Sequence, residues 1–436
     1  MKPNRIGYIY SNRRFAGELV EYNNPAGYEY RFTYGVAYIA AGLPQIGYNL
    51  PISHEAYRRN HLPPFFANLM SEGWVKRHQA KIARLDQDDK FGLLLGHGAE
   101  LIGPVSVLTE YLGDELAPAI ELPGVPKKSL KGYRIDFPRS EFNDVAIESL
   151  GGVSISGVQP KMFLTHATGK SKTLTNAVGT GPYIVKPSPN DFPELAENEF
   201  MIMQLCKAVG FNVAEHHLVP FSCGQLAYVT SRFDLDRETG RRTEFIEDLA
   251  SALDVAPGNK SSDALSYEKA ITTAYHLGGG HVQLLRDGFL QVLMAYLVGN
   301  NDLHLKNISL SRARDSNRAS GYTPIYDMVS VAPYRHYDNA GELSIWLLES
   351  EVERGFSTSS YEHYGYYTGH DFLTFANAIG LGEKAGKLLM EELSKKVAKN
   401  YAKIIAASPG SDGLKQIISK RISDRLDTLT RPALDN

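Results

Sequence analysis

The chain has 436 residues, of which 43% are hydrophobic and 22% charged, and its formal net charge is −3. That composition is typical of a globular protein with room for two or three domains, and it excludes general attraction to nucleic acid or to an anionic membrane. No stretch reaches the length of a bilayer span, and the N-terminal residues lack an apolar signal core. Two cysteines, Cys206 and Cys223, cannot supply a disulfide framework, so a reducing cytoplasm is the expected location.

The first 110 residues predict a small mixed α/β domain that shows no chemistry of its own. Residues 6–22 predict a β-hairpin, and residues 28–38 continue its alternation of polar and apolar side chains. A single helical segment is expected over 62–77 and an apolar turn over 91–95. The following segment, 111–149, contains several prolines and predicts a stiff connection.

A Gly- and Ser-rich stretch, LGGVSISGVQPK, opens a second domain predicted over 150–249. Small residues between two strands allow backbone N–H groups to approach phosphate oxygens, and Lys161 adds a cation. The strand YIVK then ends in Lys186, which matches the lysine that kinases place on the α- and β-phosphates. The stretch is neither a Walker A motif nor the Gly-rich loop of protein kinases, so an ordinary hairpin turn remains the alternative.

An amphipathic helix predicted over 194–209 supplies two glutamates that can hold this lysine in place. Glu197 and Glu199 are both candidates, and Glu199 is preferred. The strand FIED follows where the two lobes of a kinase join, and there the backbone groups of Glu247 and Leu249 can bind an adenine edge. Beyond this strand, 250–436 predicts a mostly helical lobe.

The most informative stretch of the sequence is GNNDLHLKNIS. A nearly unbroken apolar run over 289–298 predicts a buried helix, which Gly299 ends. The polar loop that follows carries these chemically active residues: Asp302, His304, Lys306 and Asn307. A carboxylate can accept a hydroxyl proton and an amide oxygen can hold a divalent metal, as in the catalytic loop of a phosphotransferase.

A second acidic site follows at IYDMVS, where an apolar, strand-like residue leads into Asp327. This is the expected position for a carboxylate that holds Mg²⁺ between phosphates. Asp302 and Asn307 can also be explained as residues that cap turns. The order of the two sites nevertheless matches the catalytic and metal loops of protein and lipid kinases. The Gly-rich run HLGGGH connects two predicted helices, so it is interpreted as a turn and not as a phosphate loop.

These motifs occur in the order found in one known family. The chain resembles the HipA-type toxins, which are the serine/threonine kinases of bacterial toxin–antitoxin pairs. In the N-terminal domain the similarity rests on FFANLMSEG and FGLLLGHGAELIGPVSVL. In the core it rests on SISGVQPK, YIVKP, ENEF, SRFD, FIEDLA, GNNDLHLKN and IYDMVS.

The resemblance implies an α+β, two-lobed, protein-kinase-like fold with a small mixed α/β N-terminal subdomain and a mostly helical C-terminal lobe. Its expected domains are 1–110, a connecting segment 111–149, an N-lobe 150–249 and a C-lobe 250–436. Asp302 would be the catalytic base, and Asn307 and Asp327 would bind Mg²⁺. The residues implied at the ATP site are Ser156, Gly157, Val158, Gln159, Pro160, Lys161, Lys186, Glu247, Asp248, Leu249, His304, Lys306, Asn307, Tyr326 and Asp327.

The resemblance also implies regulation and partners. Family members inactivate themselves by phosphorylating a serine of the nucleotide loop; Ser154 matches that position, with Ser156 as a competing acceptor. The expected partners are a HipB-like helix-turn-helix antitoxin, operator DNA through the antitoxin complex, and a protein substrate such as an aminoacyl-tRNA synthetase. No membrane partner is expected. Alternative functions are a lipid or small-molecule kinase and a mainly non-catalytic co-repressor subunit.

Overall fold

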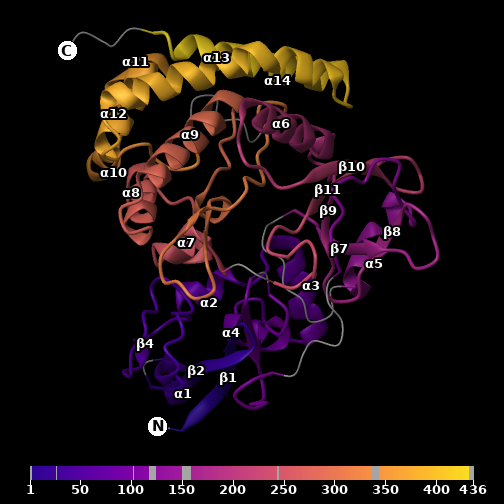
Figure 1. Cartoon of the computed structure of the whole chain (residues 1–436), viewed down its shortest axis with the longest axis vertical. Coiled ribbons are helices and arrows are strands. Elements are labelled where there is room, and N and C mark those ends of the chain that lie inside the picture. Colours follow the sequence, from indigo (N-terminus) through magenta and orange to yellow (C-terminus); the bar gives the residue numbers. More distant parts are fainter. Residues whose placement is uncertain are drawn as a thin grey trace. The chain divides into compact units, whose positions relative to one another are not determined.

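The computed structural model describes residues 2–25, 27–101, 103–116, 124–149, 159–242, 245–334 and 343–431. The chain forms two compact units, each assembled from separate stretches. The first unit comprises Met1–Pro187, Val219–Pro257 and Ser311–Asn317, and the second comprises Ser188–Leu218, Gly258–Leu310 and Arg318–Asn436. Strands dominate the first unit and helices the second (Figure 1). Among the described helices, none is long and apolar enough to cross a membrane.

The N-terminal part of the first unit is built on a five-stranded sheet in the order β4-β3-β2-β1-β5. Its strands are β1 (Pro3–Ser11), β2 (Arg14–Asn24), β3 (Gly27–Tyr34), β4 (Tyr57–Arg59) and β5 (Val105–Leu108). The predicted hairpin is confirmed as β1 and β2. Its two turn residues, Asn12 and Arg13, have φ angles of 47° and 71°, which suit the right-handed twist of a two-residue hairpin.

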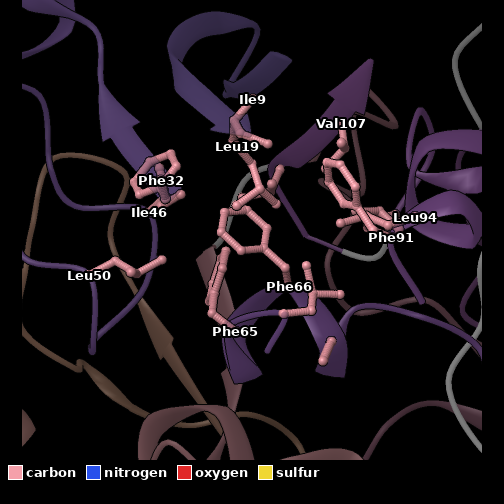
Figure 2. Packing of buried hydrophobic residues seen from close by; sticks show 14 of the residues in the cluster. Ile9, Leu19, Phe32, Ile46, Leu50, Phe65, Phe66, Phe91, Leu94 and Val107 are labelled. Carbon is pink, nitrogen blue, oxygen red and sulfur yellow. The ribbon is translucent and has the colours of Figure 1, made fainter. Parts of the chain in front are cut away.

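Four short helices cover this sheet: α1 (Val36–Ala40), α2 (Pro64–Asn68), α3 (Gly73–Ala83) and α4 (Lys90–His97). Figure 2 shows Phe65, Phe66 and Phe91 gathered with Ile9 and Leu19 in the hydrophobic core between helices and sheet. Three sequence predictions are wrong here. Residues 36–38 are helical, because β3 ends at Tyr34 and Gly35 is the N-cap of α1. The helix expected over 62–77 is broken into α2 and α3. The apolar turn expected over 91–95 is part of α4, which Asp89 caps.

A six-stranded sheet follows in the order β10-β11-β9-β7-β8-β6. Its strands are β6 (Arg134–Ile135), β7 (Met162–His166), β8 (Thr173–Asn176), β9 (Tyr183–Pro187), β10 (His216–Pro220) and β11 (Leu226–Ser231). The 3₁₀ turn η1 (Arg139–Glu141) and helix α5 (Phe142–Ser149) precede β7. Ile135 and Phe142 are buried in the core of this sheet. The part of 111–149 that was predicted as a stiff connection therefore includes a strand and a helix with core residues. The domain boundaries at 110, 150 and 250 stay predictions.

The stretch Val219–Pro257 of the first unit ends with β12 (Phe245–Asp248), α7 (Leu249–Ala252) and the first residue of η2 (Pro257–Asn259). The strand β13 (Ser309–Arg312) begins in the second unit, and its last two residues belong to the first. The strand β14 (Gly321–Tyr322) lies in the second unit. Phe245 is buried in the same core cluster as the N-terminal sheet.

The second unit is mostly helical, as predicted. Its described helices are α6 (Leu195–Val209), α8 (Tyr267–Leu277), α9 (Val282–Val298), α10 (Glu349–Arg354), α11 (Ser359–Tyr364), α12 (Gly369–Ala378), α13 (Glu383–Ala407) and α14 (Asp412–Thr428), together with the 3₁₀ turn η3 (Leu305–Asn307). The helix α9 is buried along most of its length, as its apolar sequence predicts. The Gly-rich run joins α8 to α9 as a turn in which Gly279 and Gly280 have positive φ angles.

Candidate active site

The catalytic-loop candidate begins where α9 ends. Gly299 adopts a left-handed conformation with φ 69° and closes the helix with hydrogen bonds to the Ala295 and Tyr296 carbonyls. A side chain with a Cβ is strained in that conformation, so glycine is favoured here. The next residue, Asn300, is 1% exposed, and its side-chain oxygen accepts a hydrogen bond from the Asp302 N–H at 2.9 Å. The loop that carries Asp302 is therefore fixed from its first residues.

Hydrogen bonds to the Asp302 backbone oxygen hold the loop closed. That oxygen accepts from the His304 N–H at 2.8 Å and from the Asn307 side-chain nitrogen at 3.0 Å. Because this bond uses the amide nitrogen of Asn307, its Oδ1 is the atom of the side chain that can act as a metal ligand. His304 and Lys306 are both buried side chains of the same loop. The structure thus brings together the four residues predicted here.

Tyr267 of α8 binds the backbone of this loop. Its hydroxyl donates to the Leu303 carbonyl at 2.7 Å. Burial, and to a smaller extent the negative charge of Asp302, raises the pKa of Tyr267, so the phenol stays a neutral donor. The sequence did not single out Tyr267, which lies far from the loop along the chain.

The metal-loop candidate contains a strained residue. Asp327 has φ 53°, in the left-handed region that non-glycine residues rarely adopt. Just before it, Ile325 bonds through its backbone to Asn212 and Ala214 at 2.9 Å and 3.0 Å. Strain of this kind persists where the surrounding structure over-determines the backbone, which is frequent at binding and catalytic sites.

Tyr326 joins this loop to the loop of Asp302 within the second unit. Its hydroxyl donates to the Lys306 carbonyl at 2.9 Å and lies 2.6 Å from the Ser309 hydroxyl. The Val331 N–H donates to the Gly299 carbonyl at 2.9 Å, so the loops are also joined beyond Asp327. The two sites that the sequence placed in order are therefore neighbours in space.

Asn198 of α6 is a further residue that the sequence interpretation missed. Its side chain is fully buried, and both ends of its amide bind the backbone of Ser330, donating to the carbonyl at 2.8 Å and accepting from the N–H at 3.0 Å. This pair of bonds fixes the chain just after Asp327. On the same helix, Glu199 is 2% exposed, whereas Glu197 is partly exposed and burial raises its pKa. The pairing of Glu199 with Lys186 stays a prediction.

The first unit contributes two buried lysines at one end of its six-stranded sheet. Lys161 directly precedes β7, in which Met162 pairs with Val185 of the antiparallel strand β9. Lys161 and Lys186 therefore occupy adjacent positions of the two strands, and each side chain is 5% exposed. The ammonium of Lys186 lies 5.4 Å from the centre of the Tyr228 ring. Two adjacent cations in a largely buried position suit a polyanion such as a triphosphate.

The nucleotide loop is described in part. Ser154, Ser156, Gly157 and Val158 lie outside the described residues. Of its remaining members, Gln159 donates through Nε2 to the Pro187 carbonyl at 3.0 Å, and Pro160 follows it. This bond joins the end of the loop to the end of β9, next to Lys186.

The predicted adenine-contacting segment is the junction of β12 and α7. Asp248 caps α7 by accepting a hydrogen bond from the Ser251 N–H at 2.7 Å, and Leu249 is fully buried. The Glu247 carboxyl is also buried, and it accepts hydrogen bonds from the Tyr48 N–H at 2.9 Å and the Ser251 hydroxyl at 2.7 Å. Burial raises the pKa of Glu247 to about 7.

The described part of the second unit offers too few ligands to hold a divalent metal alone, but it can hold one together with substrate phosphates and water. Among the described residues, no group of three or more His, Cys, Asp or Glu side chains could hold a metal ion. Asn307 and Asp327 offer two oxygen ligands on tethered loops. Mg²⁺ usually takes one or two protein carboxylates and completes its shell with water and substrate phosphates, which agrees with so small a set.

Comparison with known proteins decides the family. Residues 153–401, more than half of the chain, match the HipA-like C-terminal domain, and residues 8–108 match the HipA N-terminal domain. The chain belongs to the HipA family. The predicted family is thereby confirmed.

The relatives include named kinases. A Haemophilus influenzae protein that carries the name of a kinase is 34% identical over 318 residues, which cover 69% of this chain and 89% of that protein. The serine/threonine-protein kinase toxin HipA of Shewanella oneidensis is 22% identical over 369 residues, covering 81% of this chain and 79% of the toxin.

A solved structure supports the fold. It is described as the toxin–antitoxin system HipA, HipB and its operator DNA complex of Shewanella oneidensis MR-1. One chain of it matches with a TM-score of 0.71 and 20% identity, over 97% of this chain and 96% of that one. The HipA-like α+β fold predicted from the sequence is confirmed, with its mixed strand-rich part and its helical part.

Proposed function

We propose that this HipA-family protein is a serine/threonine protein kinase that uses ATP and Mg²⁺. The observation that carries the proposal is the tethering of two loops in the second unit, one with Asp302 and Asn307 and the other with the strained Asp327. The hydroxyl of Tyr326 joins them. A proton acceptor and two oxygen ligands held on adjacent loops are what phosphoryl transfer requires of the protein.

The first unit supplies the groups suited to the nucleotide itself. Lys161 and Lys186 are adjacent on neighbouring strand ends, and they would bind phosphate oxygens together with backbone N–H groups of the loop 156–160. The junction of β12 and α7, residues 247–249, would bind the adenine edge through its backbone. In the second unit, His304, Lys306 and Tyr326 would line the phosphate end of the site.

Transfer moves the γ-phosphoryl group from ATP to a serine or threonine hydroxyl. The bond between the γ-phosphorus and the β–γ bridging oxygen breaks, the bond from the acceptor oxygen to phosphorus forms, and ADP leaves. The Asp302 carboxylate orients the acceptor hydroxyl and takes its proton. Asn307 and Asp327 would hold Mg²⁺, which neutralises charge on the phosphates. Most of the acceleration comes from positioning and charge stabilisation, because the transition state is loose and anionic.

The proposal includes the family's regulation and partners. Phosphorylation of Ser154, with Ser156 as the competing acceptor, adds roughly −1.5 to −2 charges next to a segment that binds triphosphate, so it would inactivate the enzyme. The protein substrate is a translation component such as an aminoacyl-tRNA synthetase. A HipB-like helix-turn-helix antitoxin would join this chain to operator DNA, so that the complex represses its own synthesis.

Replacement of the proposed base is the decisive test. Asp302→Asn keeps the shape of the side chain but cannot accept the proton, so phosphate incorporation should fall about 10³-fold while Mg-ATP still binds. The control is Asp424→Asn, which changes an exposed carboxylate of α14 that pairs with Lys420. Incorporation of labelled phosphate by Asp302→Asn at the wild-type rate would refute Asp302 as the base.

Mapping the label tests the acceptors. Wild-type protein incubated with Mg-ATP should gain one phosphate at Ser154, and EDTA should prevent this gain. Phosphoproteomics of cells with active or Asp302→Asn protein would identify the external substrate. Labelling of lipid or a small molecule, with no labelled protein, would favour the alternative kinase classes. An inactive chain that still binds its antitoxin and DNA would favour the co-repressor.

A further inference from the structure

The Glu247 side chain lies on the buried face of β12. Successive residues of a strand face opposite sides, so Phe245 and Glu247 share one face of β12. Both side chains are buried on that face, Phe245 in the core cluster of the N-terminal sheet and Glu247 at 3% exposure. Ile246 and Asp248, on the other face, are less buried.

The Glu247 carboxyl joins two segments that are distant in sequence. Its Oε2 accepts a hydrogen bond from the backbone N–H of Tyr48, and its Oε1 accepts one from the hydroxyl of Ser251 in α7. Tyr48 belongs to the loop between α1 and β4. The carboxyl therefore connects the N-terminal region to both the strand β12 and the helix that follows it.

Two asparagines of the N-terminal region reinforce this connection. Asn49 donates through Nδ2 to the carbonyls of Ser251 and Ala252, at 2.8 Å and 2.7 Å, where α7 ends. Asn68, at the end of α2, donates to the Val255 carbonyl at 2.9 Å. Side chains of the N-terminal region thus bind carbonyls at the end of the short helix α7 and in the turn after it, and the Ser251 carbonyl accepts a second hydrogen bond from the Asp254 N–H.

The charged groups that act on the carboxyl are Asp248 and Arg312, and Arg312 in turn interacts with the tyrosines 34, 38 and 48. Arg312 is 1% exposed, and its guanidinium lies 3.5 Å from the centre of the Phe245 ring and 5.8 Å from that of Tyr48. It donates to the carbonyls of Gln45 and Ser316. Arg312 favours the ionised carboxylate of Glu247, whereas burial and Asp248 oppose it.

We infer that Glu247 is a positioning residue for nucleotide binding, through which the loop 45–49 of the N-terminal region sets the orientation of the backbone at 247–249. The inference rests on the proposed function, because it takes that backbone as the adenine contact. It adds that the N-terminal region is a working part of the nucleotide site. Without the carboxyl, the Tyr48 N–H and the Ser251 hydroxyl lose their acceptor, and β12 is freed to shift.

The test is calorimetric titration of the full-length chain with Mg-ATP, which reports the dissociation constant and the binding-competent fraction separately. Glu247→Ala should raise the dissociation constant about tenfold, because the loss of one to two hydrogen bonds weakens binding by about that factor. The stoichiometry should change little. Glu247→Gln should recover most of this loss. Its amide oxygen can accept from the Tyr48 N–H, and its nitrogen can donate to a reversed Ser251 hydroxyl.

A matched control separates positioning from stability. Glu21 is a fully buried carboxylate of the same unit, and it binds Arg5, Asn4 and Tyr30 instead of β12 or α7. Glu21→Ala should lower the competent fraction and the melting temperature but leave the dissociation constant of the folded fraction unchanged. Should Glu247→Ala fail to fold, Ser251→Ala, which removes one of the two bonds, should raise the constant about threefold.

Each remaining outcome has a distinct meaning. If Glu247→Ala or Ser251→Ala binds Mg-ATP with the wild-type constant, or loses stoichiometry alone as Glu21→Ala does, the inference is overturned and the proposed function survives. If the wild-type chain shows no binding of Mg-ATP, the proposed function fails first, and the role given to Glu247 fails with it.

Discussion

The two units hold their candidate site residues by different physical means. In the second unit, neutral groups position the acidic loops: the amides of Asn198 and Asn300 and the hydroxyls of Tyr267 and Tyr326 bind backbone atoms. In the first unit, the buried groups in and next to the candidate site are charged or titratable. They are Lys161, Lys186, Glu247 and Arg312.

This difference predicts different responses to pH. A buried amide or phenol keeps one protonation state across the physiological range, so the hydrogen bonds that these four groups make to the acidic loops should not change with pH. A buried carboxyl with a pKa of about 7 changes its charge within that range. The anchors of the two acidic loops are thus independent of pH, whereas the junction of β12 and α7 contains a group that titrates.

The largest expected effect is at Asn198. Asn198→Ala leaves the buried N–H and carbonyl of Ser330 without their partners, which should lower the free energy of unfolding by about 4 kcal/mol. Phosphate transfer should also fall sharply, because the chain beyond Asp327 loses its anchor. Urea denaturation measures the first effect, and the difference from wild type should be equal at pH 5 and pH 8.

The control for Asn198 is another helical asparagine. The side chain of Asn400 donates to the Lys396 carbonyl of its own helix, α13, at an exposed position. Asn400→Ala should change the free energy of unfolding by less than about 0.5 kcal/mol. A strongly pH-dependent cost for Asn198→Ala would break the contrast between the two units.

The next effect concerns Glu247 and is visible as a pH dependence. Its pKa in the folded chain, about 7, lies above the ordinary value of 4.5, so between these values the folded state binds more protons than the unfolded state. Stability from this group is therefore complete below about pH 4.5 and is lost as the pH rises to about 7. Glu247→Gln removes the titration, so its stability relative to wild type should increase over that window, by at most about 3 kcal/mol.

Denaturation of the two proteins at a series of pH values measures this difference. The subtraction cancels groups that titrate equally in both, such as His216, whose pKa burial lowers to about 4. A difference that stays flat between pH 4.5 and pH 7 would mean that the Glu247 carboxyl is not the pH-dependent element of the first unit.

Local patterns were sufficient to predict the elements that carry the site. The apolar run before Gly299 predicts α9, the polar loop after it predicts the position of Asp302 and Asn307, and strand alternation predicts Lys186 at the end of β9. Each of these features depends on neighbours within one or two turns or one strand. That is the range over which sequence periodicity carries information.

The sequence did not predict the residues that position the candidate site, because their hydrogen-bond partners lie far along the chain. Tyr48 donates its backbone N–H to Glu247. Almost every residue type has this group, so the identity of residue 48 cannot predict the contact. The role of Asn198 was easier to predict from the sequence. It lies on the same face of α6 as the buried Ile202 and Leu205, and a polar side chain on an apolar face needs a buried partner. The sequence could therefore have predicted a partner, but not that it is Ser330.

The smallest effect tests how the two acidic loops are joined. Tyr326→Phe removes the donor to the Lys306 carbonyl and the contact with the Ser309 hydroxyl, while it keeps the ring. Because these bonds are partly buried, water can replace them, and the free energy of unfolding should fall by about 1 kcal/mol. The rate of phosphate transfer should fall more than stability suggests, about tenfold in kcat, since small displacements between reacting groups are costly. Tyr111→Phe, which loses an exposed bond to Asp114, should change neither quantity measurably. A wild-type kcat for Tyr326→Phe would mean that Asn198 and the bond between Val331 and Gly299 suffice to align the loops.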